Sequence, residues 1–208
     1  MRSWFDTATD SAAWPSEPAY SPAVAVQLRR ARRVIVGAPR RLDAYAVAFQ
    51  LLAPLLAATM SLRQRLRTEY LIALCFAALD EHALALNCLG DVRELALRLN
   101  ELDAQADGDF LTGAIYQRQG HYGAAAEAYE CALAALRQRA PTSAVPADIP
   151  FELSILNACA FMTFLTSHYD VAASYAMESG QLLGAAPECT REAAHVAWVT
   201  ALLQRWRG

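Results

Sequence analysis

The chain alternates stretches in which apolar residues recur every three or four positions with short interruptions rich in proline, glycine and acidic residues. Such spacing puts the apolar side chains on one face of a helix, as Val24, Leu28, Ala31 and Ile35 illustrate. Because the interruptions are short, successive helices are expected to pack antiparallel. The pattern predicts nine helices, at about residues 22–36, 43–60 with a kink near Pro54, 64–79, 82–102, 108–119, 122–138, 151–166, 169–184 and 188–206.

Composition narrows the fold class to all-α. Alanine occurs 44 times and leucine 28 times among the 208 residues, and both are strong helix formers. Valine, isoleucine and threonine together occur only 25 times, too few for a β-sandwich or barrel. A charged fraction of 19% beside 55% hydrophobic residues excludes a globally disordered chain.

Residues 1–20 lack helical periodicity and are expected to form an extended arm that carries Trp4, Phe5, Trp14 and Tyr20. The arm contains acidic residues and no long apolar run, which argues against a secretory signal. The rest of the chain, 21–208, is expected to form a single helical-repeat domain.

One stretch, Ala44 to Leu62, has 19 residues without a charge, which is long enough to cross a bilayer. Pro54 in its middle and arginines on both flanks favour a buried helix instead, so no membrane association is expected. The five cysteines form no C-x-x-C pair and are expected to be buried, reduced thiols. Reduced thiols favour a cytoplasmic protein, and the complete absence of lysine is consistent with GC-rich bacterial coding.

An internal pattern of small and aromatic residues occupies residues 112–132. Small residues let two helices approach closely, and tyrosine rings fill the gaps beside them. The positions in order are Gly113, Tyr116, Gly120, Tyr122, Ala125, Tyr129 and Ala132. A fainter copy stands 40 residues earlier and another 47 residues later, at Ala73, Phe76, His82, Ala85 and Leu89 and at Ala160, Thr163, Tyr169, Ala172 and Ala176.

These positions resemble the tetratricopeptide repeat (TPR). The resemblance implies a right-handed α-solenoid of antiparallel helix pairs, with the best repeat at 105–138, weaker repeats at 65–100 and 152–184, and a capping helix at 188–206. The family repeat has 34 residues, so the longer spacing in this chain implies extended helices or loops.

The resemblance also implies a function, because the first helix of each TPR pair commonly lines a concave groove that takes a segment of a partner protein. The corresponding groove positions are Arg67, Tyr70, Leu74, Asp107, Phe110, Gln117, Arg118, Asn157, Phe161 and Phe164. The arginines and Asn157 are expected to pair with a peptide carboxylate or backbone, and the aromatic rings to act as apolar anchors or as ordinary core. The arm, 1–20, is expected to occupy this groove when no partner is bound.

No motif points to catalysis or to a metal or cofactor. The four histidines fall in different repeats, and no P-loop, nucleophile elbow or dinucleotide fingerprint is present. The run from Asp103 to Asp109 resembles the start of a calcium loop, but Ala114 stands where the bidentate glutamate is required. A solvated acidic turn at 103–107 is therefore expected, and an enzyme on a helical scaffold ranks last among the function classes.

The distribution of charge along the chain indicates an alternative kind of partner. The net charge of −3 hides a basic half, because residues 1–67 carry ten arginines and four acidic residues. A nucleic acid or another anionic surface is therefore an alternative ligand, although the solvated face of an amphipathic helix is the simpler explanation of the cluster. The candidate anion-binding residues are Arg29, Arg30, Arg32 and Arg33.

The last predicted helix has no formal charge from Ala193 to Gln204. His195, Trp198 and Leu202 share one face, whereas a terminal helix of a solenoid normally presents a polar side to water. The helix is expected either to be covered by the rest of the chain or to form a homodimer contact.

Overall fold

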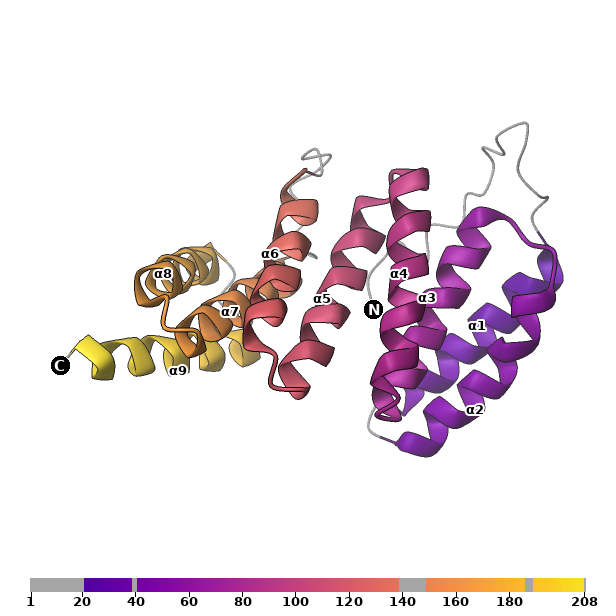
Figure 1. Ribbon diagram of the computed structural model, residues 1–208, viewed down its shortest axis with the longest axis horizontal. Helices are drawn as coiled ribbons and strands as arrows, with labels where there is room; N and C mark the ends of the chain where they lie inside the picture. Colours follow the sequence, from indigo (N-terminus) through magenta and orange to yellow (C-terminus); the bar gives the residue numbers. More distant parts are fainter. Residues whose placement is uncertain (1–20, 39–40, 139–148, 186–188, 208) are drawn as a thin grey trace. The chain divides into compact units, whose positions relative to one another are not determined.

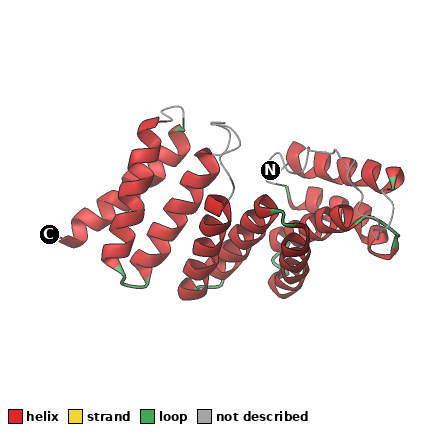
Figure 2. Cartoon of the chain, turned by 90° about the horizontal axis from the view of Figure 1, so that it is seen from above, coloured by secondary structure: helices red, strands yellow, loops and turns green. Residues whose placement is uncertain are grey.

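A computed structural model of the chain describes residues 21–38, 41–138, 149–185 and 189–207. These residues form nine α-helices and one 3₁₀ segment, and within them there is no strand (Figures 1 and 2). The elements are α1 (Pro22–Gly37), α2 (Leu42–Leu52), η2 (Ala53–Ala57), α3 (Leu62–Ala78), α4 (His82–Leu99), α5 (Leu102–Arg118), α6 (Tyr122–Gln138), α7 (Ile149–Leu165), α8 (Tyr169–Ala185) and α9 (Thr190–Arg207).

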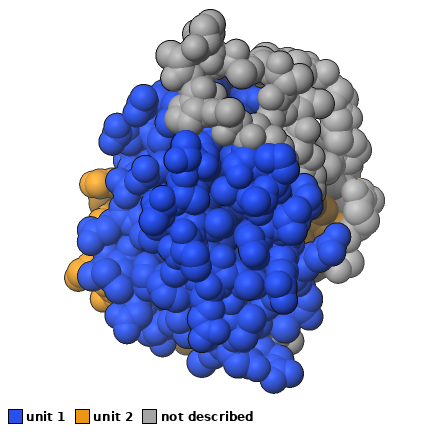
Figure 3. Space-filling model, turned by 90° about the vertical axis from the view of Figure 1, so that its right-hand side faces the viewer, with its two compact units in different colours: residues 1–108 blue, residues 109–208 orange. Residues whose placement is uncertain are grey.

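The chain divides into two compact units, residues 1–108 and 109–208, which Figure 3 colours blue and orange. The division falls within α5. In unit 1, α1 packs on α2 and α3, and α3 packs on α4. In unit 2, α7 contacts α6, α8 and α9, and α8 also contacts α9.

Helix α1 confirms the stripe expected from the sequence, since Val24, Leu28, Ala31 and Ile35 are all buried. The expected kink near Pro54 takes the form of a helix end, because α2 stops at Leu52 and η2 continues as a 3₁₀ turn. The uncharged stretch considered as a membrane span is thus divided between two short elements. Within the described residues, no helix is long and apolar enough to cross a membrane.

The expected acidic turn at 103–107 was wrong, because these residues lie inside α5. The preceding helix α4 ends instead at Asn100, whose left-handed backbone (φ 53°) closes the helix with hydrogen bonds to the carbonyls of Ala96 and Leu97. Asparagine is one of the few residues that adopts this conformation readily. Asp103 is then in the first turn of α5, where a carboxylate is favoured by the helix dipole.

The turns inside the helix pairs support the alignment of the three predicted repeats, called the repeat frame below. Asp80, Gly120 and Ser167 stand at intervals of 40 and 47 residues, and each has a positive φ, of 64°, 79° and 67° respectively. After each of them the next backbone N–H donates to a carbonyl five residues earlier, from Glu81 to Phe76, from His121 to Tyr116 and from His168 to Thr163. This is the Schellman closure of a helix, and it recurs at the three positions that the sequence pattern aligned.

The small residues of the frame are closely packed, as expected. The alanines at the helix contacts are fully buried, namely Ala73, Ala85, Ala125, Ala132, Ala160 and Ala172. Gly113 on α5 faces the ring of Tyr129 on α6 so closely that an added Cβ would lie 2.7 Å from ring carbons. Only glycine fits this contact without moving the ring.

In unit 1 a buried glutamine joins two helix starts. The Gln64 side chain accepts from the backbone N–H of Ser61, as part of a capping box at the start of α3. It also accepts from the N–H of Ser21 at 3.0 Å and donates to the Ser21 carbonyl at 2.7 Å. Since Ser21 caps α1, one fully buried side chain fixes the starts of α1 and α3 together.

The cysteines are free thiols in the structure, but not all are buried as expected. Cys75, Cys159 and Cys189 are buried, Cys88 is half-buried and Cys131 is exposed. The expectation failed for Cys131 because the buried face of α6 is set by Ala125, Tyr129, Ala132 and their neighbours, and residue 131 lies on the other side.

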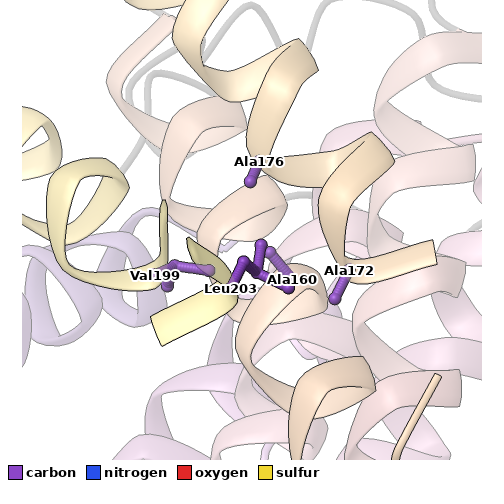
Figure 4. Close-up of a cluster of buried hydrophobic side chains, with 5 residues drawn as sticks. All are labelled: Ala160, Ala172, Ala176, Val199 and Leu203. Atoms are coloured by element: carbon purple, nitrogen blue, oxygen red, sulfur yellow. The ribbon is translucent and has the colours of Figure 1, made fainter. Parts of the chain in front are cut away.

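The end of unit 2 is built from alanines and two larger residues of α9. Val199 and Leu203 point toward Ala160 of α7 and lie beside Ala172 and Ala176 of α8 (Figure 4). This packing covers one side of α9, while Trp198 and Trp206 remain 50% and 49% exposed.

Candidate functional site

A cavity of about 660 Å³ lies within unit 2. Helices α5, α6, α7 and α9 all contribute to its wall, so residues far apart in sequence meet there. The lining residues are Phe110, Gln117, Tyr129, Phe151, Ser154, Asn157, Ala158, Phe161, Glu192, His195, Trp198 and Val199.

The rings of the wall contact one another at an angle. Phe110 meets Tyr129 with ring centroids 5.3 Å apart and Phe151 at 5.2 Å, with interplanar angles of 53° and 67°. Phe161 meets Trp198 at 4.8 Å and 51°. These are the tilted and edge-to-face arrangements that aromatic pairs prefer, so the rings hold each other in position.

The polar side chains of the wall are held by hydrogen bonds. The hydroxyl of Tyr129 donates to Oε1 of Gln117 at 2.8 Å. Burial raises the pKa of the Tyr129 hydroxyl, so it stays protonated and remains a donor. Ser154 donates its hydroxyl to the carbonyl of Pro150 at 2.8 Å, one helical turn earlier.

Asn157, in the cavity wall, connects three helices. Its Oδ1 accepts from the hydroxyl of Ser179 on α8 at 3.0 Å, and its Nδ2 donates to the carbonyl of Glu192 on α9 at 3.4 Å. Asn157 is 5% exposed and Ser179 is fully buried. A buried amide with partners on both sides fixes the position of α9 relative to α7 and α8.

Four of the expected groove residues line the cavity together, namely Phe110, Gln117, Asn157 and Phe161. Arg118 is exposed and does not line it. Phe164 packs instead against the core cluster of α7, α8 and α9 and against the ring of Tyr169.

The expected groove residues of unit 1 are not among the lining residues of this cavity. Arg67, Tyr70 and Asp107 are buried, with 9%, 7% and 5% of their surface exposed. Leu74 is half-buried on the same helix as Arg67. Side chains so enclosed contribute to the packing of unit 1.

The repeat frame did not identify the contribution of α9. Glu192, His195, Trp198 and Val199 all line the cavity, although the frame assigns the groove to the first helix of each pair. The signal available in the sequence was the uncharged face of the last helix, on which His195 and Trp198 stand.

The arginine cluster and the acidic run lie outside the cavity of unit 2. Arg29, Arg30 and Arg33 are exposed on α1, and Arg32 is half-buried. Among the residues that the structure describes, no three histidine, cysteine or carboxylate side chains are grouped as metal ligands. The expected arm, 1–20, lies outside the described residues.

The fold resembles that of known helical-repeat proteins. The chain superposes on the crystal structure of nearly identical TPR-like repeats, from a protein described as a kinesin light chain of Podosopora anserina, with a TM-score of 0.58. The match covers 88% of this chain and 97% of that chain, at 16% sequence identity. The all-α, TPR-like solenoid expected from the repeat pattern is thereby confirmed. No protein-family model and no curated protein sequence matches the chain.

Proposed function

We propose that the chain is a protein-interaction module and that the cavity of unit 2 holds a segment of its partner. The observation that carries this proposal is the wall itself, in which five aromatic rings are combined with carboxamide and hydroxyl groups. A mostly apolar wall with a few oriented polar groups is the usual composition of a binding site. Stacked helical repeats commonly present such surfaces to other proteins, and the TPR-like fold is consistent with this role.

The aromatic residues are suited to anchor a ligand. Aromatic side chains provide a large contact area and lose little conformational entropy on binding, so they are frequent among the residues that dominate interface energies. Trp198 is half exposed while its ring contacts Phe161, so a ligand reaches it without displacing a packed core. Phe110 and Phe161 are partly buried on the facing helices.

The polar groups are suited to orient an extended backbone. The bond from Tyr129 fixes the carboxamide of Gln117, and a fixed carboxamide pairs well with peptide groups. Asn157 has a different part in this proposal, since its bonds to Ser179 and Glu192 hold the wall in position.

A binding role is favoured over catalysis at the same cavity. The hydroxyls of Ser154 and Tyr129 donate to a backbone carbonyl and to a carboxamide, so neither is bonded to His195 or Glu192, the side chains of the described wall that can act as a base for a nucleophile. We therefore propose a non-catalytic protein without a cofactor.

Two tryptophans on α9 provide a matched test. Trp198 lines the cavity, whereas Trp206 does not, and the two are exposed to the same extent. A displayed library of random dodecapeptides is selected on the full chain, and the selected peptides are titrated against Trp198→Ala and Trp206→Ala. We expect Trp198→Ala to weaken binding by about tenfold or more, because anchoring aromatic residues contribute more than about 1 kcal/mol. Equal binding by both variants, or no enrichment of any peptide, would count against the proposal.

An anionic ligand at the arginine cluster is a second candidate. The exposure of Arg29, Arg30 and Arg33 on one helix favours it. Binding of a labelled oligonucleotide that falls steeply with salt, and is abolished by changing these three arginines to glutamine, supports this candidate. Salt-independent binding, or no binding, excludes it.

The homodimer contact at α9 remains a proposal of its own. The half-exposed rings of Trp198 and Trp206 are the surface that a second copy would cover. A monomer by light scattering at micromolar concentration contradicts it.

A further inference from the structure

The described part of the wall of the unit 2 cavity is negative in character. Among its described lining residues Glu192 carries the only formal charge, and no arginine is present. The five rings add to this character, because the face of an aromatic ring has a negative electrostatic potential. A ligand in the cavity therefore meets one carboxylate and several π-faces.

The angles between the rings leave parts of the ring faces open to a ligand in the cavity. Rings that stack in parallel cover one another's faces, but Phe110 and Phe151 meet at 67° and Phe161 and Trp198 at 51°. In such pairs the edge of one ring points at the face of the other, so parts of the faces stay uncovered. Trp198, whose ring is the best partner for a cation, is also the most accessible, with half of its surface exposed.

The distribution of arginines disfavours an acidic ligand at the same place. Of the two arginines expected to pair with a peptide carboxylate, Arg67 is buried in unit 1, and Arg118, although one residue from Gln117, is not part of the wall. Among the residues that the structure describes, the lining offers a carboxylate or phosphate no arginine to offset its repulsion by Glu192.

We propose that the cavity receives a cationic side chain of the bound segment, an arginine or a lysine, with or without methyl groups. The aromatic faces hold the cation by cation–π attraction, and the carboxylate of Glu192 supplies the opposite charge. Asn157 supports this arrangement because its bond to the Glu192 carbonyl fixes the backbone that carries the carboxylate. The inference rests on the proposed function, since it names the chemistry of the segment held there.

A series of short peptides tests the chemistry directly. Each has the sequence Gly-Ser-X-Ser-Gly with blocked ends, where X is arginine, its neutral isostere citrulline, trimethyl-lysine, its neutral analogue norleucine, or glutamate. The full chain is titrated with each peptide and binding is followed by calorimetry. Arginine is expected to bind about tenfold more tightly than citrulline, and trimethyl-lysine about tenfold more tightly than norleucine, with glutamate weakest.

Variants separate the carboxylate from the rings. Glu192→Gln is expected to reduce the preference for arginine over citrulline to about threefold or less, because only the weaker attraction of the rings remains. Trimethyl-lysine has no N–H donor, so its preference depends mainly on the rings and is expected to fall with Trp198→Ala. Glu127→Gln is the matched control, since Glu127 is exposed on α6 and does not line the cavity. If Glu192→Gln keeps the full preference for arginine over citrulline, the carboxylate of Glu192 is not the opposite charge, and that part of the proposal is overturned.

The outcomes distinguish this inference from the function on which it rests. Neutral peptides that bind as tightly as cationic ones overturn the cationic assignment and leave peptide binding intact. If no peptide binds, tetramethylammonium and guanidinium ions are titrated as isolated cations. Their binding, weakened by Trp198→Ala, supports the cationic cavity and contradicts the peptide role, whereas no response to either ion overturns both.

Discussion

Removing the hydrogen bond between Asn157 and Ser179 tests most directly how the cavity wall is held in position. Replacing Asn157 with leucine keeps a side chain of similar size but removes both of its hydrogen bonds. The hydroxyl of Ser179, which is fully buried, then loses its acceptor, and the carbonyl of Glu192 loses a donor.

The expected loss of stability follows from the two bonds. A buried polar group without a partner costs about 1–3 kcal/mol. The Glu192 contact is long, at 3.4 Å, so it adds only about 0.5 kcal/mol. Asn157→Leu is therefore expected to lower the free energy of unfolding of unit 2 by about 2 kcal/mol. Ser179→Ala alone removes one bond and is expected to cost about 1 kcal/mol.

The double variant gives the decisive measurement. With leucine at 157 and alanine at 179, both members of the hydrogen bond are removed, so neither leaves the other buried without a partner. The loss in free energy of unfolding is therefore expected to be smaller than the sum of the two single losses by about 1–2 kcal/mol. Urea unfolding followed by circular dichroism measures the three values, and hydrogen exchange of α9 shows whether the loss is local to its docking. Additive losses, within about 0.5 kcal/mol, would refute the coupling and the role assigned to Asn157.

Three further predictions concern packing and ionisation. Gly113→Ala is expected to destabilise the protein by about 1–2 kcal/mol in urea unfolding, because the clash with the ring 2.7 Å away exceeds the gain in helix propensity, whereas Gly180→Ala, which meets nothing within 4 Å, is expected to stabilise it by up to about 1 kcal/mol. Burial raises the pKa of Glu69, so the contribution of this carboxyl group to the free energy of unfolding is complete in acid and is lost as the pH rises through its pKa in the folded protein. Glu69→Gln is therefore expected to be more stable than the wild type in urea unfolding at pH 7, with the difference closing toward pH 4. Burial raises the pKa of Cys159 to about 12, so a thiol reagent at pH 8 is expected to modify exposed Cys131 in the native protein and Cys159 only after unfolding.

The sequence predicted the helices and their turns well because both depend on local chemistry. Many helices end at a residue with a positive φ, and Asp80, Gly120 and Ser167 occupy such positions at the intervals of the repeat. The buried alanines followed from the same frame, since small residues are needed wherever two helices approach closely. The expected turn at 103–107 failed because a run of acidic residues is equally compatible with the first turns of a helix.

The site was predicted only in part because it depends on contacts between distant residues. Phe110, Gln117 and Phe161 were identified from the repeat frame, which fixes the faces of α5 and α7. The position of α9 depends on a bond between Asn157 and Glu192, 35 residues apart, and on the packing of Val199. No local pattern encodes such contacts, so the helix that closes the cavity was recognised only by its missing charges.

Ligand binding and the docking of α9 are thermodynamically linked in this arrangement. The cavity exists only while α9 is packed on α7 and α8, because Glu192, His195 and Trp198 form part of its wall. A ligand that fills the cavity binds the docked state and not the undocked one, so it raises the equilibrium constant for docking by a factor of one plus the ratio of its concentration to its dissociation constant. By the same linkage, a substitution that loosens α9 without touching the cavity weakens the apparent affinity. Ser179→Ala is such a substitution, since Ser179 does not line the cavity and its hydroxyl donates to Asn157, which in turn bonds to α9.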